Sequence, residues 1–111
     1  MIGVHANLLS LAPGIPPSNL NSTSLDAFSV KLQWNGIDRS SMNGFPSGYI
    51  VFVYINVTII FKFTVDFSQH YLFVENLIPE TSYIFEVCAY NQAGKGPCER
   101  TATTTKASGM L

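Results

Sequence analysis

The sequence predicts an all-β fold, a seven-stranded antiparallel β-sandwich. Short stretches in which apolar and polar residues alternate recur along the chain, most clearly at residues 28–34 and 83–89. No stretch shows the 3.6-residue period of a helix, and Gly, Pro and Asn separate the stretches. Such alternation is typical of strands that are covered on one side, and seven short strands at close spacing favour two packed sheets.

Length and charge limit the classes of function. The chain has 111 residues, enough for one domain, and 47% of them are hydrophobic, while charged residues make up 12% and the formal charge is -1. This balance offers no basic footprint for nucleic acid and no polybasic patch for an anionic membrane. No apolar run approaches the roughly 18 residues that span a bilayer, so we expect no direct membrane insertion.

The N-terminal third should hold a linker and two strands. Residues 1–15 show no sustained period, which predicts a linker or a disordered segment. They also make a poor secretory signal peptide, so a secreted form of this chain would be a piece of a longer protein. An edge strand is expected from Pro17, followed by a turn at residues 23–27. The strand at residues 28–34 should point four side chains inward: Phe28, Val30, Leu32 and Trp34.

The middle of the chain is unusually apolar. Residues 35–47 form a long connection with turn chemistry at Asn43 and Gly44. Residues 48–55 are apolar on both faces of the strand that they predict, and residues 58–63 form a second strand of the same kind. We expect the core side of the first strand to consist of Tyr49, Val51 and Val53.

Three further strands complete the expected sandwich. Residues 71–75 lead to Leu77, with Leu72 and Val74 inward, and Pro79 ends that segment. Residues 83–89 form a long strand, residues 91–97 a Gly- and Pro-rich hairpin loop, and the Thr-rich residues 99–105 the last strand. Residues 107–111 are expected to be a tail.

One stretch resembles a known family. Leu77-x-Pro79-x-Thr81-x-Tyr83, followed by Val87-x-Ala89-x-Asn91-x-x-Gly94-x-Gly96-Pro97, is similar to a corner, strand and loop of fibronectin type III domains. The resemblance covers about residues 16–106, and further positions that match are Pro17, Leu20, Leu32, Trp34, Gly48, Tyr49, Val51 and Thr105. It implies immunoglobulin-like, fibronectin type III topology, with core anchors at Trp34, Tyr49, Leu77 and Tyr83. Leu32 stands where a true immunoglobulin domain has its first bridging Cys.

The resemblance implies a class of function. Members of the family serve mainly as ectodomain modules of adhesion and receptor proteins, so we expect a spacer and protein-interaction module at the cell surface or outside the cell. Its partners would be neighbouring domains, a second copy of the chain, or other proteins. The alternative is an intracellular, muscle-type structural module. The Arg-Gly-Asp tripeptide and the Trp-Ser-x-Trp-Ser box known in the family are both absent from this sequence.

No group of residues predicts catalysis. His5 and His70 are the only histidines, and neither is accompanied by the groups of a nucleophilic triad. Two Cys ten residues apart do not form a zinc site, and no helix follows Gly94-Lys95-Gly96 to receive a phosphate. We therefore expect no enzyme, no cofactor, no metal and no small-molecule substrate.

Two modifications are open questions. Asn21-Ser22-Thr23 and Asn56-Val57-Thr58 are candidate N-glycosylation sites at Asn21 and Asn56. Cys88 should face outward, and Cys98 should begin the last strand of the same hairpin. A disulfide forms if the register places them directly opposite each other, and otherwise they remain free, poorly exposed thiols.

The excess of apolar residues predicts an interaction face. The outer side of one sheet would present a cluster of apolar side chains: Ile50, Phe52, Tyr54, Ile84, Cys88 and Tyr90, with part of residues 59–61. Aromatic anchors of this kind often dominate interface energy. Alternatively, loops, a glycan at Asn56 or the tail cover these residues, or the register of residues 48–55 slips by one.

Overall fold

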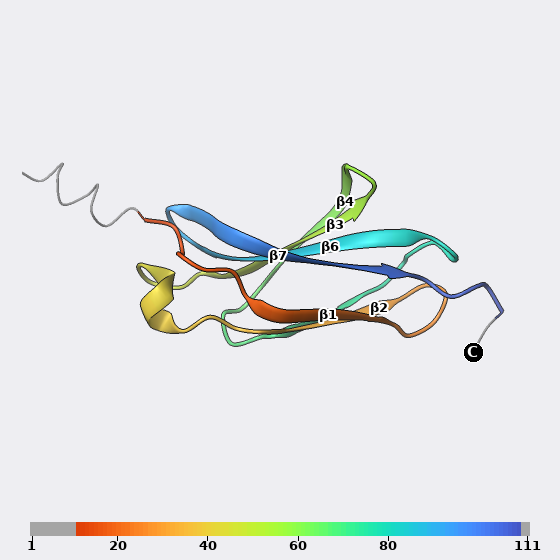
Figure 1. The fold of residues 1–111 in the computed structure, drawn as a ribbon, viewed down its shortest axis with the longest axis horizontal. Helices are drawn as coiled ribbons and strands as arrows, with labels where there is room; N and C mark the ends of the chain where they lie inside the picture. Colours follow the sequence, from red (N-terminus) through yellow and green to blue (C-terminus); the bar gives the residue numbers. More distant parts are fainter. Residues whose placement is uncertain (1–10, 110–111) are drawn as a thin grey trace, which may run out of the picture.

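The computed structural model describes residues 11–109, which fold into two antiparallel sheets packed face to face (Figure 1). A three-stranded sheet has the order β1-β2-β5, and a four-stranded sheet has the order β4-β3-β6-β7. The strands are β1 (Ser18–Ser24), β2 (Val30–Asn35), β3 (Gly48–Ile55), β4 (Thr58–Val65), β5 (Tyr71–Val74), β6 (Ser82–Asn91) and β7 (Gly94–Thr104). The predicted seven-stranded antiparallel sandwich is confirmed.

The core lies between the sheets and is built by alternation. Tyr49, Val51 and Val53 of β3 are fully buried, as are Phe85 and Val87 of β6. Three of the expected anchors, Trp34, Leu77 and Tyr83, are at most 4% exposed and belong to the same cluster. The ring of Trp34 meets Tyr49 edge to face at 5.6 Å, whereas Tyr83 lies beside Phe85 at 6.3 Å.

A corner before β6 is fixed by three hydrogen bonds. The backbone N–H of Ile78 donates to the Tyr83 hydroxyl at 2.7 Å, and the Thr105 hydroxyl donates to the Ile78 carbonyl at 2.6 Å. The Thr81 N–H donates to the same Thr105 hydroxyl at 3.0 Å. Since Tyr83 and Thr105 are buried, these bonds satisfy their hydroxyl groups and tie the start of β6 to the end of β7.

Side-chain hydroxyls join the two sheets along one edge. Ser22 of β1 is hydrogen-bonded to the hydroxyl of Thr103 and lies 3.4 Å from that of Thr101, both on β7. The Thr103 hydroxyl also donates to the Ser22 carbonyl at 3.3 Å. β1 and β7 are edge strands of different sheets and form no backbone ladder with each other. The bonds between these two edges are therefore made through side chains.

The expected start of the second strand is wrong. The alternation predicts that Phe28 points inward, yet its side chain is 50% exposed and β2 begins only at Val30. The Asp26 carboxylate accepts hydrogen bonds from the Phe28 N–H at 2.8 Å and the Ser29 hydroxyl at 2.9 Å. This Asx turn removes Phe28 from the strand, and Ala27 is buried in its place.

Other element ends also differ from expectation. β1 runs to Ser24 through part of the expected turn, and β7 begins at Gly94, before the expected residue 99. The connection at residues 35–47 contains a short 3-10 helix, η1 (Arg39–Met42), which buries Met42. Pro97 lies within β7, which is an edge strand and so tolerates a residue without an N–H group.

Residues 11–15 are hydrogen-bonded to the rest of the domain. They are the part of the expected N-terminal linker that the structure describes. Asn91 donates to the Leu11 carbonyl at 2.8 Å, and the Gly14 N–H donates to the Ser41 carbonyl at 2.9 Å. Pro13 is buried, and a Cβ at Gly96 would lie 2.5 Å from the Pro13 carbonyl oxygen. Residues 1–10 and 110–111 of the expected linker and tail lie outside the described residues.

Candidate interaction face on the four-stranded sheet

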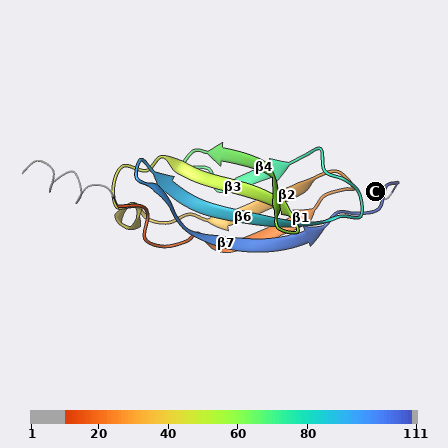
Figure 2. The same cartoon turned by 90° about the horizontal axis from the view of Figure 1, so that it is seen from above.

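The strands of the four-stranded sheet lie side by side in the order β4, β3, β6, β7 (Figure 2). Because paired residues share a face, the strand pairing places three rows of side chains on the outer side of this sheet. The rows run from β4 through β3 and β6 to β7. They are Ile59–Tyr54–Ile84–Ala102, Lys62–Phe52–Glu86–Arg100, and Thr64–Ile50–Cys88–Cys98. The structure therefore brings together Ile50, Phe52, Tyr54 and Ile84, and Tyr90 lies on the same side, opposite Gly48.

The middle row is charged, which the sequence did not indicate. Glu86 accepts hydrogen bonds from Arg100 Nε at 2.8 Å and from the Tyr54 hydroxyl at 2.9 Å. The Arg100 guanidinium also lies 5.1 Å from the centre of the Tyr54 ring, within range of a cation–π interaction. Glu86, Arg100 and Tyr54 therefore form one polar network, the Glu86 network, across three strands.

The network shifts the acidity of its members. Burial raises the pKa of Glu86, but the hydrogen bonds from Arg100 and Tyr54 outweigh this effect and hold that pKa below its usual range. Burial, together with the bond to the Glu86 carboxylate, raises the pKa of Tyr54. At neutral pH the face thus presents an ionised carboxylate paired with an arginine.

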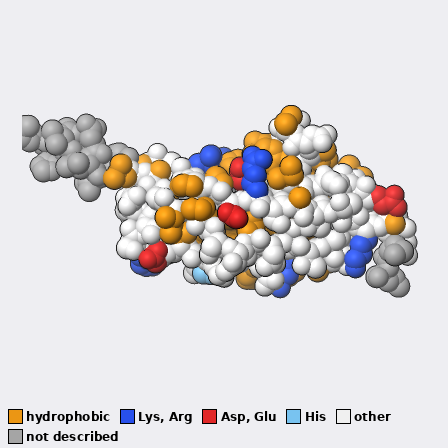
Figure 3. Space-filling view, viewed as in Figure 1, with side chains coloured by type: hydrophobic (Ala, Val, Ile, Leu, Met, Phe, Trp, Pro, Cys, Tyr) orange, Lys and Arg blue, Asp and Glu red, His pale blue; other side chains and the backbone are white. Residues whose placement is uncertain are grey.

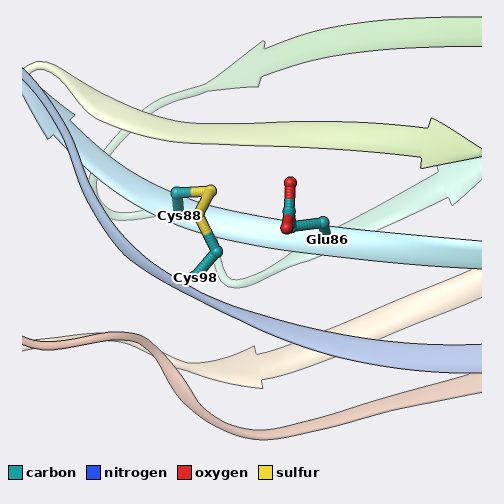
Figure 4. A group of neighbouring side chains, drawn as sticks. All are labelled: Glu86, Cys88 and Cys98. Atoms are coloured by element: carbon teal, nitrogen blue, oxygen red, sulfur yellow. A yellow bond between two sulfur atoms is a disulfide. The ribbon is translucent and has the colours of Figure 1, made fainter. Parts of the chain in front are cut away.

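A disulfide closes the third row. Cys88 and Cys98 are directly opposite each other on β6 and β7, with Cα atoms 4.3 Å apart and sulfur atoms bonded at 2.03 Å (Figure 4). The sequence allowed two registers for this hairpin, with the two cysteines either directly opposite or offset. The structure has the register in which they are directly opposite. Cys88 lies on the outer side of the sheet, opposite Ile50 and Cys98, and its side chain is fully buried there.

The apolar members of the face differ in exposure. Ile50, Phe52, Tyr54, Ile84 and Tyr90 are half-buried, whereas Ile59 and Ile60 of β4 are 50% and 37% exposed. A bulge between Val53 and Tyr54 shifts the pairing, so Phe61 packs against the core instead of joining the face. Figure 3 shows hydrophobic side chains around a blue and red group beside the projecting β3–β4 hairpin.

The same region includes the one candidate metal group found among residues 11–109. Glu86, Cys88 and Cys98 offer ligand atoms within 4.8 Å of one another. A metal requires the thiolate form of cysteine, and both sulfur atoms are bonded to each other here. The group therefore offers a single carboxylate, which is already paired with Arg100.

The two sequons lie on opposite parts of the molecule. Asn56 is at the tip of the β3–β4 hairpin with φ of 54°, next to Val57, which is 93% exposed. Asn21 is exposed on β1, in the other sheet.

The outer side of the three-stranded sheet holds a groove that no motif in the sequence predicts. Its volume is about 640 Å³, and Tyr71 and Phe73 line it with their side chains about half exposed. The remaining lining residues are Asn19, Asn21, Lys31, Gln33, Trp34, Asn35 and His70. The alternation of Tyr71 and Phe73 with the inward Leu72 and Val74 was the available signal. Among the described residues, no helix has the length and hydropathy to cross a membrane.

Comparisons with known proteins agree with this architecture. The family model described as "Fibronectin type III domain" matches residues 15–105. Mouse "Protein sidekick-2" is 36% identical over 87 residues, which are 76% of this chain, and rat "Oncostatin-M-specific receptor subunit beta" is 31% identical over 106 residues, with 80% of this chain covered. The chain spans only 4% and 11% of these two relatives.

A solved structure matches the fold over most of both chains. The solution structure of the fn3 domain of human contactin 1 has a TM-score of 0.77 and 22% sequence identity. The match covers 90% of this chain and 84% of that one.

Proposed function

The chain belongs to the fibronectin type III family, and from this membership we propose that it is a non-enzymatic spacer and protein-interaction module in the ectodomain of an adhesion or receptor-type protein. Two features support the location. One relative is named as a receptor subunit. The Cys88–Cys98 disulfide also fits an oxidising compartment, where such bonds persist.

The shape of the domain suits a spacer. The first and last described residues lie at opposite ends of the long axis in both views (Figures 1 and 2). Neighbouring domains joined at these ends would be held one domain length apart. The face of the four-stranded sheet lies along the side of this axis and stays free for a partner.

The side chains on the outer face of the four-stranded sheet indicate what kind of protein surface would bind there. Ile59, Tyr54 and Ile84 offer an apolar row, and the Glu86 network lies beside it with Lys62. A protein surface with an apolar ridge flanked by charged groups would fit these rows, since interfaces combine a hydrophobic centre with polar contacts at the rim. The candidate partners are a neighbouring domain that bends back along this side, a second copy of this chain, or another protein.

The disulfide provides the test of location. The chain should be expressed behind a secretory signal, alkylated with and without reductant, and weighed by intact mass spectrometry. We expect Cys88 and Cys98 to be alkylated only after reduction. Two reactive thiols in a folded, exported chain, or a chain that fails to leave the cell, would contradict the proposal and favour the intracellular, muscle-type module.

A further inference from the structure

The groove on the three-stranded sheet is organised by strand register. Asn21, Gln33 and Tyr71 lie in one row across β1, β2 and β5, and Thr23, Lys31 and Phe73 lie in the next row. Both ends of the Asn21-Ser22-Thr23 sequon are therefore on the groove side of the sheet, whereas Ser22 contacts β7. The sequon and the two aromatic residues share one surface although they are 50 residues apart in the sequence.

The two aromatic residues form an exposed platform. Their ring centres are 5.9 Å apart with an interplanar angle of 73°, and Lys31 Nζ lies 5.6 Å from the centre of the Phe73 ring. Tyr71 is 49% exposed and Phe73 is 48% exposed. Around them the groove offers side-chain amides from Asn19, Gln33 and Asn35. Rings that receive C–H groups and amides that bond hydroxyls are the groups that suit a sugar surface.

We infer that the groove is the resting surface of an N-linked glycan attached to Asn21 of this same chain, an inference that rests on the secretory location proposed above. The glycan would cross Gln33 and stack its first N-acetylglucosamine units on Tyr71 and Phe73. Two strand spacings separate Asn21 from Tyr71, about 10 Å, a span within reach of an asparagine side chain that carries a chitobiose unit.

The attachment site is free to react. Asn21 is exposed, and its amide nitrogen makes one long contact, 3.5 Å to the Asn19 carbonyl. The nitrogen forms a bond to the anomeric carbon of an oligosaccharide carried on a polyprenyl diphosphate, which the secretory route supplies. The bond from that carbon to phosphate breaks, polyprenyl diphosphate leaves, and one amide proton is released.

Asn56 provides the internal control. Its sequon lies at the tip of the β3–β4 hairpin, which projects from the body of the domain in Figure 1. The groove with Tyr71 and Phe73 is on the other sheet. A glycan on Asn56 should therefore point into solvent and leave the stability of the fold unchanged.

The experiment uses the secreted, glycosylated chain and its thermal midpoint. Asn21→Gln should lower the midpoint by several degrees, and Asn56→Gln should not change it. In a Tyr71→Thr/Phe73→Thr background, Asn21→Gln should no longer have an effect, because the platform is gone. In chain made without glycosylation, Asn21→Gln should be neutral, which separates loss of the glycan from loss of the asparagine.

Three results would overturn the inference in distinguishable ways. If Asn21 carries a glycan but Asn21→Gln leaves the midpoint unchanged, or lowers it equally without the aromatic pair, the glycan does not rest in the groove. If only Asn56 is glycosylated, the inference fails while the secretory location stands. If the chain is not exported, or carries free thiols and no glycan, the proposed function fails with it.

Discussion

At the scale of single residues, Trp34, the one tryptophan of the chain, is a central part of the core. It is 4% exposed and packs edge to face on Tyr49, which is buried in turn. Its indole nitrogen is buried and has no hydrogen-bond partner among the described residues. This side chain therefore stabilises the fold through the apolar area that it buries and through its packing against Tyr49. The unsatisfied N–H group opposes part of that stabilisation.

Replacing Trp34 with Ala should lower the free energy of unfolding by about 3 kcal/mol, the low end of the usual range for Trp because an unsatisfied donor is removed as well. Urea denaturation measures the loss. Trp34→Phe is the matched control: it keeps a ring against Tyr49, loses the unpaired N–H, and should cost clearly less. An unchanged midpoint for Trp34→Ala would contradict a core position for this side chain.

Glu86 should make the free energy of unfolding depend on pH. Its pKa is lowered in the folded chain by Arg100 and Tyr54, so its stabilising contribution is complete above its ordinary value of 4.5 and is lost as pH falls through the folded value. Arg100 is 56% exposed, which limits the contribution to about 1 kcal/mol or less.

Glu86→Gln should therefore lower the urea midpoint at pH 7 and lower it less at pH 3, which is below the ordinary pKa of 4.5. The exposed Glu99 on the same hairpin is the control, and Glu99→Gln should change the midpoint little at either pH. A Glu86→Gln deficit that is the same size at pH 3 as at pH 7 would show that the Glu86 network does not act through charge.

At the scale of strands, the sequence predicts the central residues of each strand better than the residues at which the strand begins and ends. The alternation within β3 and β6 identifies the core side correctly, because each strand has one face that must be covered. The start of β2 is set by the Asp26 turn, and β7 continues through Pro97 because it pairs with β6 as far as the turn. The Asp26 turn is a local feature that competes with the alternation of residues 28–34, whereas the start of β7 depends on pairing with β6, which no local pattern records.

The face of the four-stranded sheet illustrates the same limit. Its apolar residues were recognisable from their alternation, but the Glu86 network needs Tyr54, Glu86 and Arg100 from three strands, and only the register joins them. Phe52 is consequently a poor site for a test charge, because Glu86 lies directly opposite it. Ile59, which is 50% exposed and next to Tyr54, is a cleaner position.

Ile59→Lys should weaken self-association of the chain at least about tenfold, as expected when an apolar contact at the centre of an interface is lost. Sedimentation equilibrium measures this change. Leu25→Lys, at a side chain that is 43% exposed in the turn after β1, is the control and should have no effect. Equal weakening by both variants, or a wild-type chain that stays monomeric, would contradict a homotypic use of this face.

At the scale of the whole molecule, the two outer surfaces have different chemistry. One combines the apolar rows with the Glu86 network and the disulfide, and the other has the amide-lined groove with Tyr71 and Phe73. The fold and its core were readable from the sequence, since motif order and alternation agree. The groove was not, because its residues come from β1, β2 and β5, which become neighbours only when the sheet forms.

The position of the disulfide also determines how the domain would respond to tension applied through its two ends. The bond joins residues that are 10 apart, so the turn between β6 and β7 cannot be pulled straight even when every other strand has been extracted. At about 3.5 Å per extended residue, this holds back roughly 30 Å of extension. β7 can peel from β6 beginning at Thr104, but only as far as Cys98. Within an array of such domains, the bond would act as a fixed stop on stretching, and reducing it would lengthen the tether.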